Sequence, residues 1–308
     1  MSAPTLPLDS AASSTRESSA FAIEFENVEL AFEDNKVLRG VSFRLPFGET
    51  KALFGVAGSG KSTLLKLALG LLKPDAGRIL VLGKDVTQTP EQDLFALRAK
   101  IGMVFQESAL FDSLTVSENV AYQLMEERGI YDDEIDRRVR ETLRFVELEH
   151  TIDKFPSELS GGMRRRVAIA RAIITQPELL LYDSPTGGLD PVTSNTIVEL
   201  IMKQRDVSKT SSLLVTHRLQ DAFTMATHQF DPQTNQMRSL PRGHYCDVPM
   251  SFLVLREGKV IFDGDVRQIA HTKDEYIREY ISQQSTSVTS PSSLFPLRPL
   301  SMAMRRSA

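Results

Sequence analysis

The sequence predicts an α/β fold, and three observations carry this prediction. Short apolar runs typical of buried strands recur along the chain, among them 50–54 and 179–183. Segments with the composition of helices separate these runs, for example the leucine-rich stretch 64–72. Residues 21–32 alternate apolar and polar side chains, which predicts a half-buried strand, and 37–45 holds a second strand that we expect to pair antiparallel with it. The core should therefore combine buried strands with helices, next to an antiparallel sheet.

The remaining elements follow from the same kinds of pattern. The stretch 77–85 predicts a strand followed by a turn, and 94–99 predicts a short helix. An apolar strand is expected at 101–105. Late in the chain, a strand hairpin is expected at 252–264, and 274–281 predicts a short final helix.

Composition restricts the class of protein. The chain has 308 residues, of which 41% are hydrophobic and 25% are charged, as is usual for globular proteins. A net charge of −4 gives no indication of a nucleic-acid partner. The single cysteine, Cys246, excludes an intrachain disulfide and fits a reducing compartment. No apolar run approaches the roughly 18 residues of a membrane span. We therefore expect a cytoplasmic protein, and any membrane function would have to come from a partner chain.

The ends of the chain differ in composition from its middle. Residues 1–20 are rich in Ser, Ala, Thr and Pro and lack the basic and apolar regions of a signal peptide, so they predict a disordered arm. One folded unit is expected over 21–282, with a helical subdomain at about 107–172. The tail at 283–308 combines Ser, Thr and Pro with scattered apolar residues, and predicts a flexible segment or an arm that docks on a neighbour.

A glycine-rich loop separates the strand at 50–54 from the leucine-rich helix. Residues 55–63 fit the pattern G-x-x-x-x-G-K-[ST] at every fixed position. Glycines let backbone N–H groups surround phosphates, and the helix N-terminus adds a partial positive charge. Lys61 should contact the β- and γ-phosphates, and the Ser62 hydroxyl should coordinate Mg²⁺. The alternative is a glycine-rich turn with a structural role only. The residues assigned to ATP are Gly55, Gly58, Ser59, Gly60, Lys61, Ser62 and Thr63.

A second motif makes the assignment specific. The sequence LSGGMRRR at 159–166 precedes an alanine-rich helix, and an apolar strand then ends in Asp183. Together with the loop at 55–63, these motifs resemble those of the ATP-binding cassette (ABC) ATPases, whose signature sequence is LSGGQ. The resemblance covers about 21–264. It implies a P-loop, RecA-like ABC ATPase core with an antiparallel β subdomain and an α-helical subdomain, and it implies the ATPase subunit of a transporter.

The resemblance also assigns roles to single residues. It implies that Phe32 stacks on the adenine ring of ATP, although a packed sheet residue is the alternative at this position. Gln106 matches the glutamine that contacts Mg²⁺ and the attacking water, and Asp183 matches the Walker B carboxylate that holds Mg²⁺ through water. His217 matches the switch histidine at the γ-phosphate. Asp190 matches the D-loop residue, which communicates across a dimer.

The signature implies a second copy of the chain. In this family the helix that begins with Ser160, Gly161 and Gly162 binds the γ-phosphate of the ATP held by another copy. We therefore expect a head-to-tail dimer with two nucleotides between its subunits. The basic run at 164–166 is interpreted as a structural and electrostatic feature of this helix and not as a nucleic-acid patch.

One position departs from the family pattern. The residue after Asp183 is usually a glutamate that acts as general base, but this chain has Ser184. A serine hydroxyl can orient water but cannot accept its proton near neutral pH, and general base catalysis contributes about 10²–10⁴-fold. We expect slow hydrolysis unless His217 compensates in part, and retained ATP binding. The alternative function is a nucleotide-gated clamp with impaired hydrolysis.

A further departure is an insertion at about 228–251, which we expect to form an extended hairpin or loop. It contains His228, His244, Cys246 and Asp247, whose spacing matches no strong zinc pattern.

Two details concern a membrane partner. The segment 108–120 matches the part that faces the membrane partner in transporters of this family. Within it, Phe111, Leu114 and Val116 are expected either to contact that partner or to pack inside the helical subdomain. A soluble ABC protein acting on ribosomes or DNA is a remote alternative, because the chain holds one cassette and no long heptad pattern.

Several stretches point to one branch of the family. Met163 in the signature and the segments 110–122 and 274–280 resemble the ATPases of the Mla and Mce (mammalian cell entry) lipid-transport systems. This resemblance implies an integral-membrane permease and an MCE-domain protein that carries phospholipid or another hydrophobic substrate. It also implies a peripheral position on the cytoplasmic face of the inner membrane.

Overall fold

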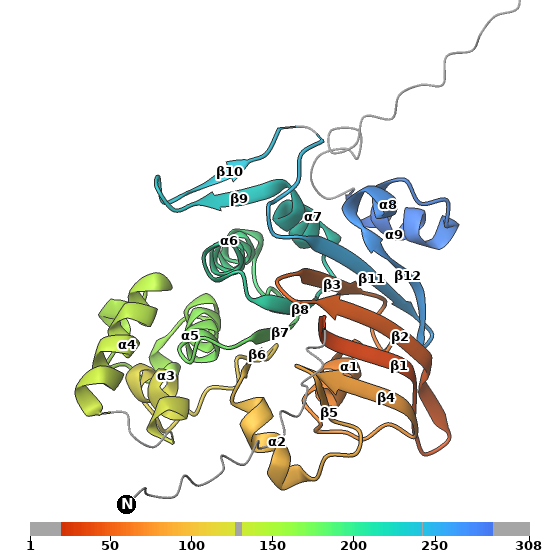
Figure 1. Ribbon diagram of the computed structural model, residues 1–308. Coiled ribbons are helices and arrows are strands. Elements are labelled where there is room, and N and C mark those ends of the chain that lie inside the picture. Colours follow the sequence, from red (N-terminus) through yellow and green to blue (C-terminus); the bar gives the residue numbers. More distant parts are fainter. Residues whose placement is uncertain (1–19, 127–130, 242, 286–308) are drawn as a thin grey trace, which may run out of the picture.

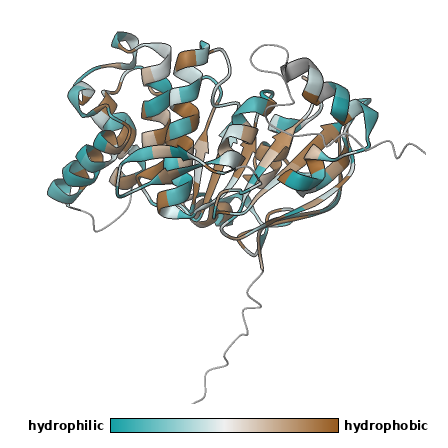
Figure 2. Ribbon diagram, turned by 90° about the horizontal axis from the view of Figure 1, so that it is seen from above, coloured by the Kyte–Doolittle hydropathy of each residue, from teal (hydrophilic) through white to brown (hydrophobic). Residues whose placement is uncertain are grey.

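The computed structural model describes residues 20–126, 131–241 and 243–285. The expected N-terminal arm lies outside these residues except for its last position, and so does the tail from 286 onward. In Figure 1 the red and orange strands from the start of the chain lie on one side of the molecule, and the yellow and green helices lie on the other. Viewed from above, the strands are mostly hydrophobic and the outer helices carry most of the hydrophilic residues (Figure 2).

A six-stranded sheet forms the centre, in the order β12-β11-β3-β8-β7-β6. Its strands pair in parallel, except that β12 is antiparallel to β11. Every residue of β3 and β8 is buried, as expected for a parallel sheet covered on both faces. The bounds are β3 (Thr50–Phe54), β6 (Ile101–Val104), β7 (Leu179–Asp183), β8 (Ser211–Val215), β11 (Met250–Arg256) and β12 (Lys259–Asp265).

A second, antiparallel sheet of four strands has the order β2-β1-β4-β5. The rings of Phe25 and Phe43 stack on one another across β1 and β2, with centroids 4.7 Å apart. Helix α1 buries its leucines in a hydrophobic core shared by this sheet and the central sheet. The sequence predictions for this part are therefore confirmed. The bounds are β1 (Phe21–Phe32), β2 (Asn35–Pro46), α1 (Lys61–Ala68), β4 (Ala76–Val81) and β5 (Lys84–Asp85).

Helices α3, α4 and α5 lie together on the side away from the antiparallel sheet (Figure 1). The stretch 107–115, expected to be mainly helical, has no helix. The reason is the buried side chain of Asn119, whose amide donates to the carbonyls of Phe111, Leu114 and Thr115 at 2.9–3.0 Å and fixes a loop. The bounds are α2 (Glu91–Arg98), α3 (Val116–Met125), α4 (Asp132–Phe145), α5 (Gly161–Ile173), α6 (Pro191–Ser208) and α7 (Leu219–Thr227).

The insertion forms a two-stranded antiparallel hairpin, followed by an irregular stretch up to β11. A buried ion pair on α6 holds the hairpin in place: Arg205 and Asp206 lie 2.7 Å apart and are 1% and 4% exposed. Arg205 also donates to the His228 carbonyl at 3.0 Å, and the Phe230 amide donates to Asp206 at 2.7 Å. Removing one partner of such a pair costs about 3–5 kcal/mol. The strands are β9 (His228–Asp231) and β10 (Gln236–Ser239).

The C-terminal part differs slightly from expectation. Strand β11 begins at Met250, two residues before the predicted start of the hairpin. Asp265 caps a short helix, α8 (Val266–Ala270), that the sequence did not predict. The final helix, α9 (Glu275–Ser285), continues three residues into the segment expected to be a flexible tail.

Within the described ranges, no group of three or more His, Cys, Asp or Glu side chains is placed to hold a metal ion. Cys246 is a buried free cysteine whose thiol donates to the Val248 carbonyl at 3.0 Å. None of the helices in the described part of the chain is long and apolar enough to cross a membrane.

Candidate ATP site

The parallel sheet gathers the predicted site residues at one edge. Phe54 ends β3 directly before the glycine-rich loop at 55–63, and Asp183 ends β7. Gln106 follows β6 and His217 follows β8, and both side chains are exposed. Since parallel neighbours end at the same edge of a sheet, these segments lie around one site, where ligands of open α/β sheets bind.

Two glycines of the loop occupy positions that no other residue fits. Gly55 has φ 152°, and a Cβ there would lie 2.3 Å from the Leu255 carbonyl oxygen. Gly60 has φ 100°, and its Cβ would lie 2.9 Å from a methyl group of Leu38. The loop is therefore pressed between β11 and β2, which gives it a fixed shape before any ligand binds.

The loop contains donors that suit a triphosphate. The Ser59 hydroxyl is buried and has no hydrogen-bond partner among the described residues, so a phosphate oxygen would satisfy it. Lys61 donates to the carbonyls of Gly55 and Val56, both at 2.8 Å. Burial lowers the pKa of Lys61, and the charge of Asp183 opposes this shift. A phosphate offers this ammonium a charged acceptor in place of two neutral ones.

The ligands that suit Mg²⁺ meet beside Lys61. The Ser62 hydroxyl donates to the Asp183 carboxylate at 3.2 Å. A hydroxyl and a carboxylate are oxygen ligands of the kind that Mg²⁺ takes alongside nucleotide phosphates. The Gln106 side chain lies beside Gly187 in the loop that follows Asp183, because a Cβ on Gly187 would be 3.6 Å from it. The residues present therefore fit a Mg²⁺ ion held mainly by Ser62 and Asp183.

Ser184 is held by its backbone at the end of β7. Its amide donates to the Val215 carbonyl of β8 at 2.9 Å, and its carbonyl accepts from the Gly187 amide at 2.8 Å. Its φ of 47° lies in the left-handed region, which few residues other than glycine adopt. Whatever side chain occupies this position is therefore aimed by the fold, and here it is a hydroxyl.

A buried pair that the sequence reasoning missed connects two of these segments. The Thr186 hydroxyl donates to the Asp221 carboxylate at 2.6 Å, and Arg218 lies 3.4 Å from the other carboxylate oxygen. Burial raises the pKa of Asp221, while the Thr186 hydrogen bond and the charges of Arg218 and His217 oppose the rise. The pair ties the turn that carries His217 to the loop after Asp183. No local sequence signal pointed to this pair, because Thr186 and Asp221 lie 35 positions apart.

The signature motif begins a helix, as predicted. Ser160 caps α5 and accepts from the Met163 amide at 3.2 Å. A Cβ on Gly162 would lie 2.3 Å from the Thr193 methyl group, so glycine permits α5 to approach the start of α6. Asp190 caps α6, and its hydrogen bonds with Thr193 lower the pKa of its carboxyl group. Ser160 and Asp190 are both exposed, at neighbouring helix N-termini.

Phe32 lies at the turn between β1 and β2, and its side chain is 47% exposed. Leu38, the fourth residue after that turn, lies against the loop at Gly60. The aromatic ring is therefore carried by the same hairpin that flanks the glycine-rich loop, and it remains accessible for stacking.

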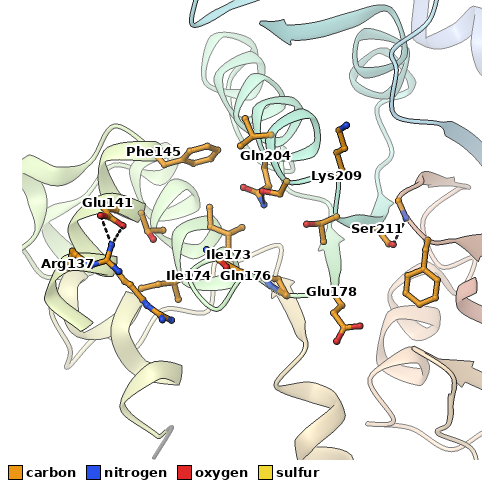
Figure 3. Close-up of a pocket in the computed structure, with 18 residues that line it drawn as sticks. Arg137, Glu141, Phe145, Ile173, Ile174, Gln176, Glu178, Gln204, Lys209 and Ser211 are labelled. Atoms are coloured by element: carbon orange, nitrogen blue, oxygen red, sulfur yellow. Dashed lines mark hydrogen bonds and ion pairs between the residues drawn. The ribbon is translucent and has the colours of Figure 1, made fainter. Parts of the chain in front are cut away.

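A hollow away from this site lies on another part of the described residues. It measures about 840 Å³ and is open to solvent between α4, the end of α5 and the end of α6, with Arg137, Phe145 and Lys209 in its wall (Figure 3). Glu178 and Ser211, which also line it, mark the amino ends of β7 and β8. None of the predicted ATP-site residues lines this hollow, and the amino end of a parallel sheet is not where such folds bind ligands.

Comparison with known proteins identifies the family. The family model described as ABC transporter matches residues 38–187. Over 267 residues the chain is 36% identical to the Arabidopsis thaliana protein TRIGALACTOSYLDIACYLGLYCEROL 3, chloroplastic, covering 84% of this chain and 72% of that protein. The chain belongs to the ABC transporter ATP-binding proteins. ATP hydrolysis coupled to transport is the activity of this family.

Other ABC proteins are similar over shorter shares of their length. The probable ribonucleotide transport ATP-binding protein mkl of Mycobacterium leprae (strain TN) is 37% identical over 66% of this chain and 59% of its own length. Methionine import ATP-binding protein MetN 1 of Bacillus cereus is 41% identical over 64% of this chain and 58% of its own length. The chain thus spans less than two thirds of these two relatives.

Solved structures confirm the ABC cassette fold. A dimeric ATP-binding cassette in a post-hydrolysis state, bound to ADP and Pi, is similar with a TM-score of 0.67 at 28% identity, over 80% of this chain and 99% of that chain. The structure of cbiO1 from Clostridium perfringens, part of the ABC transporter complex cbiONQ, has a TM-score of 0.68 at 27% identity, over 87% and 95%.

Proposed function

We propose that this chain is the ATP-hydrolysing subunit of a transporter of the Mla/Mce type, which moves phospholipid or another hydrophobic substrate. The observation that carries the substrate class is the similarity to TRIGALACTOSYLDIACYLGLYCEROL 3, whose name refers to a galactolipid and of which this chain covers 72%. The chain covers only 59% of the length of the relative named for ribonucleotide transport and 58% of the length of the relative named for methionine import. An MCE-domain protein that carries the substrate belongs to the same proposal.

Different residues of the ATP site are suited to phosphate binding, to Mg²⁺ binding and to orientation of water. Lys61 and the loop amides bind the phosphates, and Ser62 with Asp183 holds Mg²⁺. Bound Mg²⁺ supplies charge that stabilises the leaving phosphate oxygens. Gln106 and His217, at the ends of β6 and β8, orient the attacking water.

The signature supports a head-to-tail dimer. The N-terminus of α5 is exposed at Ser160, and a helix N-terminus attracts anionic phosphate. Since the chain's own glycine-rich loop binds its own nucleotide, this second phosphate site is available to the ATP of another copy. The similar dimeric cassette bound to ADP and Pi supports the same arrangement.

An aromatic hollow next to the segment of Gln106 supports a membrane partner. The hollow measures about 480 Å³. Phe95, Phe105, Phe111 and Tyr122 line it and are 66%, 39%, 43% and 43% exposed. Such a cluster of exposed aromatic residues is typical of a protein interface. We propose that a permease docks here and holds the chain at the cytoplasmic face of the inner membrane.

The three apolar residues considered for this contact fall into different environments. Val116 is fully buried inside the helical part of the fold, which is the second of the two expected positions for this residue. Leu114 is half-buried. Phe111 stacks against Tyr122 with ring centroids 4.6 Å apart, and the Arg171 guanidinium lies 5.7 Å from its ring. Phe111 is therefore presented to solvent by a rigid support.

We expect Phe111→Asp to uncouple the chain from its permease. The charge replaces an apolar ring that lines the hollow, and substitution of such an aromatic residue in an interface commonly costs about 2 kcal/mol or more. Affinity for the permease should fall at least about 30-fold, while ATP binding by the isolated chain stays within about twofold. Pull-down with the permease and titration with a fluorescent ATP analogue measure both. Tyr131→Asp, at a residue that is 82% exposed and does not line the hollow, is the control.

The transport proposal is tested with the complex that co-purifies with this chain. We would reconstitute it in vesicles, supply fluorescent phospholipid, and follow ATP-dependent lipid transfer, with methionine and a ribonucleotide as competing cargoes. Phospholipid transfer that requires ATP supports the proposal. Turnover stimulated by methionine or by the ribonucleotide, without lipid movement, overturns the substrate class.

Ser184 favours a second candidate, a nucleotide-gated clamp. In that case ATP binding closes the dimer on the permease, and hydrolysis is too slow to drive a cycle. ATP-dependent dimerisation of the native chain without release of phosphate would support this candidate over the motor.

A further inference from the structure

The three arginines that follow the signature glycines have separate roles in the fold. Arg164 donates to the Leu159 carbonyl at 2.6 Å, at the start of its own helix. Arg166 donates to the Val146 carbonyl at 3.2 Å, beside the end of α4. Arg165 instead points into the ATP-site loops and is only 4% exposed. The basic run therefore contains one buried guanidinium with a different environment.

Arg165 contacts three backbone carbonyls in two loops, the one after β6 and the one after β7. Its Nη1 donates to the Ser184 carbonyl at 3.2 Å. Its Nη2 donates to the Gln106 carbonyl and lies 3.5 Å from that of Gly187. Gln106 follows β6, Ser184 follows β7, and Gly187 leads to Asp190. One planar side chain thus links the segment that orients water, the general-base position and the loop that reaches the second copy.

Burial of the Arg165 charge costs free energy, which contacts with the surrounding loops must offset. Burial lowers the pKa of Arg165, and Glu107 is the charge that opposes this shift. Within the described ranges no carboxylate forms an ion pair with the guanidinium, and its Nε has no hydrogen-bond partner. Burying a charge without an ion pair costs several kcal/mol. The three carbonyls of the two loops compensate this cost, so the loops and the guanidinium hold one another in place.

We propose that Arg165 is a positioning residue that couples the two ATP sites of the dimer, an inference that rests on the proposed head-to-tail arrangement. The signature at Ser160 contacts the nucleotide of the other copy, while Gln106 and Ser184 serve the chain's own nucleotide. Arg165 lies on the same helix as the signature and holds both of these loops. When ATP in the other site draws α5 inward, Arg165 moves the water-orienting loops of its own site with it.

The proposal predicts a specific loss of cooperativity. Arg165→Met removes the hydrogen bonds to the loops and retains much of the side-chain volume. We expect kcat to fall about 10–100-fold, the effect of misplaced positioning groups, while KM for ATP stays within about threefold. The Hill coefficient for ATP should fall from above 1 toward 1. Arg165→Lys, which keeps one donor group, should recover part of both losses. Arg166→Met is the matched control on the same helix and should leave the Hill coefficient unchanged.

The experiment uses the purified full chain with ATP alone, so it does not depend on lipid or permease. Thermal unfolding is measured for each variant, because a purely structural role lowers Tm and the active fraction but leaves the Hill coefficient unchanged. If native turnover is too slow to follow, the Hill coefficient of ATP-induced dimerisation replaces it as the readout. Unchanged cooperativity in both Arg165 variants overturns the inference, and so does an equal loss in Arg166→Met. If the complex transfers no lipid but Arg165→Met still loses cooperativity, the transport proposal is refuted and the role of Arg165 is supported.

Discussion

Lys61→Ala is expected to abolish ATP turnover. Lys61 is the one cationic residue of the loop at 55–63, and its ammonium group donates to two carbonyls of that loop. Its removal takes away the charge that stabilises the phosphates in the transition state, and one such donor is worth about 10²–10³-fold in kcat. Phosphate release by the purified chain, alone and with its permease, measures the effect.

The control for this variant is Lys66→Ala. Lys66 lies in the last turn of the same helix, α1, and is exposed. It should change turnover by less than about twofold, because exposed charges distant from a site contribute little. A Lys61→Ala chain that kept more than about a tenth of native turnover would show that the measured ATPase activity comes from another site or another protein.

Ser184→Glu is expected to raise kcat by about 10²–10⁴-fold, the contribution of a general base. The backbone at this position is held by the Val215 carbonyl, the Gly187 amide and Arg165, so a glutamate would be aimed as the serine is. Serine already accepts the left-handed φ of 47°, and glutamate adds no further restriction there. Single-turnover hydrolysis separates this chemical step from nucleotide exchange.

Ser184→Gln tests whether the gain in Ser184→Glu comes from general base catalysis or only from the larger side chain. Glutamine has the same size as glutamate but cannot accept the proton. It should show no gain over the native chain. Fast turnover in the native chain, with no gain in Ser184→Glu, would show that serine is tolerated and that the motor function stands without a carboxylate. Native ATP binding without turnover, together with hydrolysis by Ser184→Glu, would support the nucleotide-gated clamp.

Local patterns predicted most of the fold and the location of the ATP site. The loop at 55–63 and the signature at 159–166 are contiguous, and each needs only its own strand or helix to take shape. The strand that ends at Asp183 begins with three leucines, and the strand before His217 ends in Leu-Leu-Val, and such short apolar runs indicate buried strands. These features depend on residues that are neighbours in the sequence.

The features that were missed depend on long-range contacts. Arg165 reaches the carbonyl of Gln106, 59 positions earlier, and Asp221 accepts from Thr186, 35 positions earlier. Asn119 replaces an expected helix with a loop through hydrogen bonds that only tertiary packing makes possible. The local sequence around a polar residue does not determine whether its side chain stays in solvent or becomes a buried hydrogen-bond donor.

The ion pair of Arg205 and Asp206 attaches the inserted hairpin to α6, so the hairpin moves when this helix tilts. Helix α6 begins at the exposed Asp190 cap, next to the signature helix, and holds the hairpin near its other end. The two points are separated by about 22 Å of helix at 1.5 Å per residue. A tilt of α6 by about 10° at its N-terminus would therefore displace the hairpin by about 4 Å. Closure at the nucleotide would thus be magnified on a distant surface of the molecule.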